Sequence, residues 1–163
     1  MLFRSPDRPG TPTAVAGDRS VRLSWETPEA GASPLTDFTV QVQSKSPTAL
    51  RLGPWREVSR RSGLSSTMTV RRLRNGWVYR FRVRARTQVG RSSWSTSGIV
   101  VPHTIPGRAA RLTPRNTAGG VLLSWPRPSS DGGSPILDYE LEYSTTGVPW
   151  TRVNRASGPA RTG

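Results

Sequence analysis

The chain has 163 residues, enough for one or two small domains, and it contains no cysteine. The absence of cysteine excludes a disulfide scaffold, cysteine catalysis and a thiolate metal site. The formal net charge is +14, and Lys45 is the single lysine among the 24 basic residues. This charge suits polyanionic partners. The excess of arginine over lysine is also explained by the codon bias of a GC-rich genome. No apolar run is long enough to cross a membrane, and no signal-peptide pattern is visible after Met1.

The first copy of a repeated pattern predicts seven short strands, beginning with a weak one near residues 12–16. The second and third strands alternate cleanly, and a loop rich in Pro, Gly and Ser over residues 27–34 separates them. Their inward positions are Val21, Leu23, Trp25, Phe38, Val40 and Val42. Alternation with a period of two indicates that one face of each strand is buried.

Four more strands are predicted before the middle of the chain. They lie near residues 55–58, around Met68 and Val70, over residues 79–86, and over residues 99–101. The strand over 79–86 has the strongest pattern, with Tyr79, Phe81, Val83 and Ala85 on one face and Arg80, Arg82, Arg84 and Arg86 on the other. Many short antiparallel strands between frequent turns predict an all-β sandwich of two sheets.

Three segments then return in the same order. Residues 21–28 (VRLSWETP) recur as 121–128 (VLLSWPRP), 33–38 (SPLTDF) as 134–139 (SPILDY), and 54–58 (PWREV) as 149–153 (PWTRV). A repeat distance of about a hundred residues is the size of a domain, so the sequence predicts a tandem of one module. The second copy reaches its fourth strand and lacks the last three, which leaves Trp125 and Tyr139 covered on one side only.

The motifs together resemble the fibronectin type III domain, an immunoglobulin-like fold. They are Pro9-x-x-Pro12, Val21-x-Leu23-Ser24-Trp25-x-x-Pro28, Leu73-x-x-Gly76-x-x-Tyr79-x-Phe81-x-Val83-x-Ala85, and Gly90. The loop over residues 130–135 of the second copy is similar to loops of bacterial secreted proteins. An immunoglobulin domain proper fits less well, because the tryptophan lies on the second strand and no cysteine pair brackets it.

The resemblance implies roles for particular residues. Trp25 is expected at the centre of the core, and Tyr79 is expected to form a tyrosine corner with backbone near Leu73. Asn75 and Gly76 are expected to supply the turn before that tyrosine. The full set of expected core residues is Trp25, Leu73, Tyr79, Val83, Trp125 and Tyr139.

The same reading divides the chain into parts. We expect an N-terminal tail over 1–5, a complete module over 6–102, a linker over 103–107 and an incomplete second module over 108–163. We expect the chain to be a piece of a longer protein or to end at a premature stop, with completion of the second module by a strand of another chain as the alternative.

The resemblance implies a non-catalytic spacer or protein-binding module of a larger extracellular or cell-surface protein. Its partners are then other protein domains of the same or a neighbouring chain, with anionic polysaccharide as a further possibility, while nucleic acid is not expected. An accessory region of a secreted polysaccharide-degrading enzyme and a polyanion-binding module are the alternatives. No cofactor is expected.

Candidates for catalysis or metal binding are weak. His103 is the single histidine and lies at the domain junction, where an exposed linker residue is expected. The run Asp131-Gly132-Gly133 lacks the Gly-Lys-Ser/Thr of a phosphate loop and suits a turn. Asp138, Glu140 and Glu142 have the spacing of the outer face of a strand. We therefore predict neither a catalytic nor a metal site.

The four arginines at positions 80, 82, 84 and 86 are the remaining candidate. In one interpretation this ladder binds sulfated or phosphorylated polymers. In the other, Trp94 stacks on Arg82 or Arg84 and the ladder is structural, as in the related motif of cytokine receptors. Trp77, in the turn before the ladder strand, is expected to be an exposed aromatic residue with a contact role as the alternative.

Overall fold

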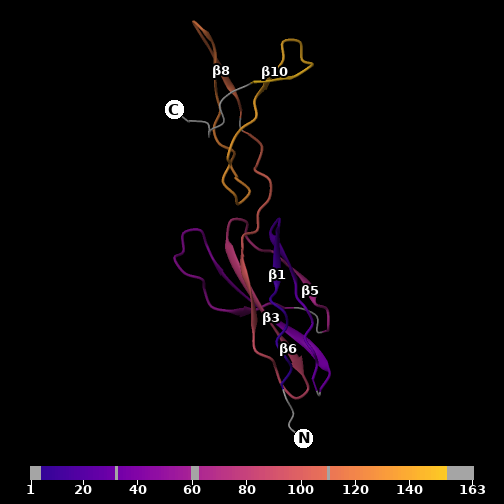
Figure 1. Cartoon of the computed structure of the whole chain (residues 1–163). Coiled ribbons are helices and arrows are strands. Elements are labelled where there is room, and N and C mark those ends of the chain that lie inside the picture. The colour runs from indigo at the N-terminus through magenta and orange to yellow at the C-terminus, as the bar shows by residue number, and fades with distance from the viewer. Residues whose placement is uncertain (1–4, 32, 60–62, 110, 154–163) are drawn as a thin grey trace. The chain divides into compact units, whose positions relative to one another are not determined.

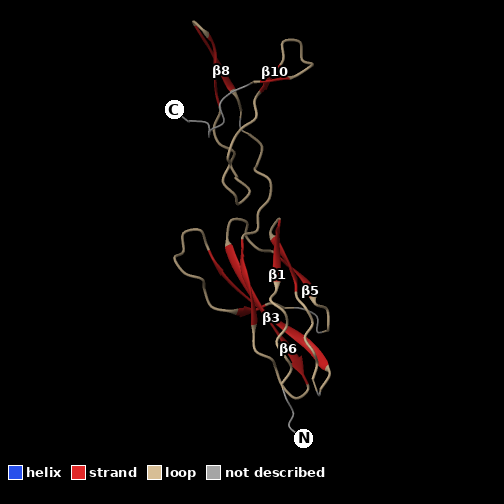
Figure 2. Ribbon diagram, viewed as in Figure 1, coloured by secondary structure: helices blue, strands red, loops and turns tan. Residues whose placement is uncertain are grey.

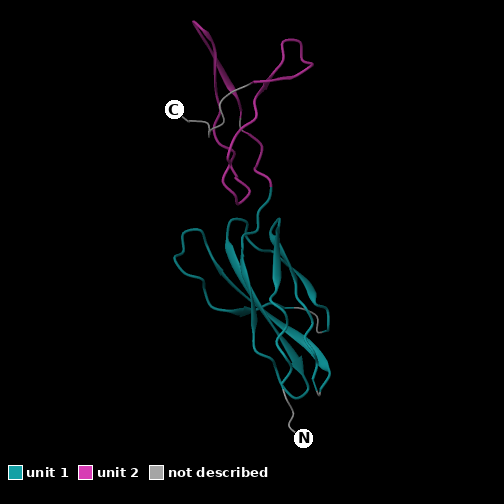
Figure 3. Cartoon of the chain, viewed as in Figure 1, with its two compact units in different colours: residues 1–104 teal, residues 105–163 magenta. Residues whose placement is uncertain are grey.

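The computed structural model describes residues 5–31, 33–59, 63–109 and 111–153. Within these ranges the chain has strands, turns and loops and no helix (Figure 2). It divides into two compact units, residues 1–104 and 105–163 (Figure 3). No helix of the described part is long and apolar enough to cross a membrane.

The first unit is a sandwich of two antiparallel sheets, which confirms the predicted fold class (Figure 1). One sheet has the order β1-β2-β5, with bounds Thr13–Gly17, Ser20–Ser24 and Thr67–Arg71. The other has the order β4-β3-β6-β7, with bounds Arg56–Glu57, Leu35–Lys45, Val78–Thr87 and Ser95–Val100. The strand predicted near residues 55–58 is thus only two residues long.

The core lies between the two sheets and is built from the alternating positions of their strands. Val21 and Leu23 enter it from β2, whereas Phe81 and Val83 enter it from β6, and all four are almost fully buried. Trp25 packs edge-on against Phe38, with ring centroids 5.5 Å apart and an interplanar angle of 68°. Replacing one such large side chain by alanine typically costs about 3–5 kcal/mol.

The turn before β6 is held by a buried tyrosine. The hydroxyl of Tyr79 accepts a hydrogen bond from the backbone N–H of Arg74 at 2.9 Å, one residue beyond Leu73. Gly76, at a φ of 76°, occupies the left-handed region that glycine adopts without strain. Asn75 anchors the same turn to the β1–β2 turn by accepting a bond from the N–H of Arg19 at 2.8 Å.

Strand β7 differs from its prediction. It begins at Ser95 rather than at residue 99, and its pairing with β6 shifts between Arg80 and Arg82. The shift is a β-bulge, which turns the strand so that Val100 is 7% exposed and Ile99 is 67% exposed. Ile99 was predicted as part of the strand, but the bulge places it outside the core.

The second unit consists of two short antiparallel pairs. Strand β8 (Thr113–Thr117) pairs with β9 (Gly120–Ser124), and β10 (Glu142–Tyr143) pairs with β11 (Thr151–Arg152). Several of its large apolar side chains are exposed, including Leu137 at 83% and Trp150 at 60%. Burial of apolar surface stabilises a fold by about 25 cal/mol for each Å² removed from water, and these exposed side chains do not contribute that stabilisation.

Candidate functional site

The arginine ladder lies on the outer face of β6, opposite polar residues of β3. Arg80, Arg82 and Arg84 are directly across from Gln43, Gln41 and Thr39. Arg82 and Arg84 are half-buried, while Arg80 and Arg86 are exposed. The ladder therefore has two covered members in its middle and one open member at each end.

Arg82 is enclosed by two tryptophans. Its guanidinium carbon lies 4.4 Å from the ring centroid of Trp55 and 4.3 Å from that of Trp94. Its Nε and Nη2 atoms both donate to Oε1 of Gln41, at 2.9 and 2.6 Å. Partial burial lowers the pKa of the Arg82 guanidinium below its ordinary value. Stacking and hydrogen bonding together commit this side chain to the fold.

Arg84 has a stacking partner but weaker polar support. Its guanidinium carbon lies 4.3 Å from the same Trp94 ring, so one indole covers two arginines. Its Nε is buried and has no hydrogen-bond partner among the described residues. Desolvation, followed by the positive charges of Arg91 and Arg82, lowers the pKa of Arg84, and Glu57 acts in the opposite direction.

The two ends of the ladder differ from each other. Arg80 donates from Nε to the carbonyl oxygen of Ser97 on β7 at 3.1 Å. Arg86 lies directly opposite Arg91 in an antiparallel bridge, which places two positive charges on neighbouring positions. Like charges directly opposite each other in a sheet are destabilising.

Two members of this face were not anticipated from the sequence. Trp55 precedes the two-residue strand β4, and Glu57 within β4 pairs with Gln41. The alternation of Trp55 and Glu57 at spacing two was the available signal, but it is too short to show which face of the sheet they occupy. Trp94 was predicted to stack on Arg82 or Arg84, and in the structure it stacks on both.

Trp77 was expected to be exposed, and that expectation is wrong. The side chain is half-buried and packs against the core. The guanidinium of Arg74 lies over its ring at 4.8 Å. The chain turns at Gly76, so Trp77 lies back on the module.

The remaining candidates from the sequence have ordinary surroundings. His103 is exposed, and its Nδ1 lies 3.0 Å from the carbonyl oxygen of Val101. The N–H of Gly133 donates to Oδ1 of Asp131 at 2.8 Å, which closes the glycine-rich turn on itself. No group of three or more His, Asp or Glu side chains that could hold a metal occurs in the described ranges.

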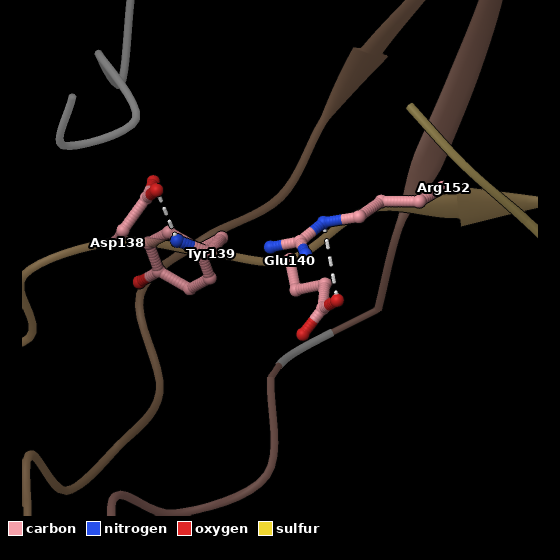
Figure 4. A network of polar contacts seen from close by, with 4 residues as sticks. All are labelled: Asp138, Tyr139, Glu140 and Arg152. Carbon is pink, nitrogen blue, oxygen red and sulfur yellow. Dashed lines mark hydrogen bonds and ion pairs between the residues drawn. The ribbon is translucent and has the colours of Figure 1, made fainter. Parts of the chain in front are cut away.

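The acidic row of the second unit does not form the continuous strand that its spacing suggested. Only Glu142 lies within a strand, β10. Asp138 accepts a hydrogen bond from the N–H of Tyr139 at 2.8 Å, and Glu140 forms an ion pair of 3.2 Å with Nε of Arg152 (Figure 4). Asp138 and Glu140 thus have separate local partners, and the three carboxylates do not form one shared site.

A hollow of about 550 Å³ opens in the second unit between its two strand pairs. Its lining includes the aromatic rings of Trp125, Tyr139 and Trp150. Trp125 and Tyr139 meet edge-on at 5.6 Å and 71°, close to the geometry of Trp25 and Phe38 in the first unit. In the first unit, residues of β6 belong to the same core cluster as that pair.

Comparison with known proteins gives one family. The model of the fibronectin type III domain matches residues 7–101. Titin of Drosophila melanogaster is 32% identical over 160 residues, which cover 93% of this chain and 1% of that protein. Protein sidekick-1 of Mus musculus is 33% identical over 141 residues, which cover 81% of this chain and 6% of that protein. The chain therefore spans a small part of these relatives.

The solved structures agree on the fold. Titin module A71 from human cardiac muscle superimposes with a TM-score of 0.51 at 28% identity, covering 60% of this chain and 92% of the module. The relatives named here come from animals and give no support to the resemblance with bacterial secreted proteins.

Proposed function

Because this chain belongs to the fibronectin type III domain family, we propose that its first unit is a non-catalytic spacer that also contacts other protein domains. We place these partners in the same chain or a neighbouring one, outside the cell or at its surface. The complete module covers residues 6–102, and residues 103–107 form a short linker, made semi-rigid by Pro106 and by Pro102 just before it.

The observation that carries the proposal is the position of the two ends of the module. The carbonyl of Pro9 accepts a hydrogen bond from Oγ of Ser95, where β7 starts. The carbonyl of Pro102 accepts one at 2.9 Å from the N–H of Gly76, just before β6. Ser95 pairs with Val83, midway along β6, and Ser5 approaches Gly90 in the turn after β6. The chain therefore enters and leaves at opposite ends of the sandwich. Such a module sets a fixed distance between its neighbours.

Single-molecule energy transfer tests the spacer. The chain has no cysteine, so Asp7→Cys with His103→Cys places one dye at each end. The ten residues of β6 extend about 30 Å at 3.3 Å per residue, so we expect one narrow distance population at or above that value. Asp7→Cys with Val89→Cys is the control, because Ser5 approaches Gly90 and this pair lies at one end.

Two or more native populations in the end-to-end pair, or a distance equal to that of the control pair, would contradict a rigid spacer. Neither result depends on the identity of the neighbouring domains.

We further propose that residues 108–163 are an incomplete second copy of the module. Beyond the repeated motifs, the pairing of β8 with β9 supports this proposal. Thr113 pairs with Ser124 as Thr13 pairs with Ser24 in β1 and β2. Asp138 accepts from the N–H of Tyr139 as Asp37 accepts from the N–H of Phe38, both at 2.8 Å.

Polyanion binding is a second candidate function. The observation that favours it is that no arginine of the ladder forms an ion pair with a carboxylate anywhere in the described ranges. If the ladder binds polyanions, changing Arg80, Arg82, Arg84 and Arg86 to Gln should abolish retention on heparin. Changing the exposed Arg8, Arg22, Arg51 and Arg71 instead removes the same charge elsewhere. Equal loss of retention in both variants would rule out a dedicated site.

A further inference from the structure

The ladder divides into two halves with different hydrogen bonding. Arg80 and Arg82 use their guanidinium groups within the fold, on the carbonyl of Ser97 and on Oε1 of Gln41. Arg84, Arg86 and the neighbouring Arg91 form no side-chain hydrogen bond or ion pair with any described residue. The arginines at the β6–β7 end therefore keep all of their side-chain hydrogen-bonding capacity, whereas Arg80 and Arg82 each use part of theirs within the fold.

These three arginines lie on neighbouring positions of one sheet face. Arg84 and Arg86 are two residues apart on β6, and Arg91 is directly opposite Arg86. Opposed residues in an antiparallel pair have Cβ atoms about 5 Å apart, and diagonal neighbours lie about 7–8 Å apart. Long side chains at such positions reach a common point above the sheet.

The acidic groups near Arg84, Arg86 and Arg91 form no ion pair with them in the described ranges. Asp37 is opposite Arg86 on the β3 side, but its Oδ1 accepts bonds from the N–H groups of Phe38 and Gly63 at 2.8 and 3.0 Å. Glu57 acts on Arg84 from β4, two strands away, and its effect ranks below those of Arg91 and Arg82. Arg82 adds a further positive charge beside Arg84.

Trp94 orders one of these three arginines, Arg84. Its ring lies 4.3 Å from the guanidinium carbon of Arg84 and so restricts the orientation of that group. Stacking uses the face of a guanidinium and leaves its in-plane N–H groups free to donate. For Arg84 these are the Nη groups, because Nε is buried. An arginine that is already ordered loses less side-chain entropy when it binds a ligand.

We propose that Arg84, Arg86 and Arg91 form a binding site for one tetrahedral oxyanion, the sulfate or phosphate group of an ester. Arg80 and Arg82 are then part of the fold and not of the site. This proposal rests on the second candidate function, polyanion binding, and names the residues and the chemical group that it would use. Arginine suits this ligand because its fork of N–H groups matches the spacing of oxyanion oxygens.

The test uses the full chain labelled with ¹⁵N and follows the arginine Nε–H signals by NMR. Inorganic sulfate and inorganic phosphate are titrated in separate arms against sodium chloride at equal ionic strength. We expect saturable shifts at Arg84, Arg86 and Arg91 with at least one of the two anions, and smaller shifts at Arg80. Saturation by sulfate alone or by phosphate alone identifies the ester.

The variant Arg84→Gln/Arg86→Gln/Arg91→Gln removes the site. Its affinity for the anion should fall about tenfold or more, because bonds to charged groups are stronger than neutral ones. The variant Arg8→Gln/Arg22→Gln/Arg51→Gln removes the same charge from exposed positions and should bind within about twofold of the parent, because screening weakens distant charges. The variant with glutamine at positions 84, 86 and 91 is expected to fold, since it relieves the repulsion between Arg86 and Arg91.

Shifts that match those in chloride, or equal losses in the two triple variants, would overturn the site. Heparin retention distinguishes this failure from failure of polyanion binding. If retention is lost in the four-residue ladder variant and kept in its control, while sulfate and phosphate both fail to saturate, the site is wrong and polyanion binding stands.

Discussion

Tyr79 shows how one hydroxyl can hold a turn in a module of this kind. The ring lies in the core, 6% exposed, while its oxygen accepts the N–H of Arg74. Sequence resemblance anticipated a bond near Leu73, and the structure places the donor one residue later. The same side chain thus serves the core through its ring and the turn through its oxygen.

We predict that Tyr79→Phe lowers the free energy of unfolding by about 1–3 kcal/mol, because the N–H of Arg74 loses its partner while the ring stays packed. Urea unfolding followed by tryptophan fluorescence measures the change. Tyr143→Phe, at an exposed position of the second unit, is the matched control and should leave the midpoint unchanged. The same midpoint in Tyr79→Phe and the parent would contradict the tyrosine corner.

The stack on Trp94 makes a prediction about pairs of residues. A double-mutant cycle of Arg84→Gln with Trp94→Ala should give a coupling energy of about 0.5–2 kcal/mol. Arg86→Gln with Trp94→Ala is the control cycle, because Arg86 lies on the same strand face and has no aromatic contact in the described ranges. Equal coupling in the two cycles would mean that the effect is long-range charge rather than stacking.

At the level of the strand, β7 shows how a bulge selects which side chain is buried. Residues 99 and 100 are both β-branched and apolar, yet only Val100 reaches the core. Its partner across β6 is Tyr79, so Val100 closes the core beside the tyrosine corner.

We predict that Val100→Ala lowers the free energy of unfolding by about 1.5–2.5 kcal/mol, at about 0.8 kcal/mol for each buried methylene-sized group together with some cavity cost. Ile99→Ala removes more carbon but should change stability by less than about 0.5 kcal/mol, as is usual for surface positions. Chemical denaturation of the two variants compares them. The reverse order would place the bulge elsewhere in β7.

The two units differ in how completely each can bury its own core. The first has strands on both sides of Trp25, and its buried residues form one cluster. The second has an aromatic pair of similar geometry, Trp125 and Tyr139, beside an open hollow. With fewer than about 60 residues, a unit also buries a small fraction of its surface.

We therefore predict that residues 1–104 fold alone and residues 105–163 do not. The first piece should show near-ultraviolet circular dichroism that is lost in one cooperative step with urea, and the second should show neither. The full chain, unfolded in parallel, should reproduce the midpoint of the first piece. A cooperative transition in the isolated second piece would contradict this prediction.

Periodicity and repetition in the sequence were enough to predict the sandwich, the inward faces of β2, β3 and β6, and the ladder of arginines. These features are local, because a strand with period-two alternation has one apolar face wherever it pairs. The resemblance to a family added the expected tyrosine corner, and Trp94 was recognised as a partner because it follows the ladder closely in the chain.

Long-range pairing decided the rest. Trp55 lies 27 positions before Arg82, and only the placement of β4 beside β3 brings its ring onto that guanidinium. The bulge in β7 and the opposition of Arg86 to Arg91 likewise depend on how β6 meets its neighbour. A row of alternating arginines is the same in sequence whether each one is stacked, hydrogen-bonded or open to solvent. That difference arises from the side chains that the adjacent strands place around each guanidinium.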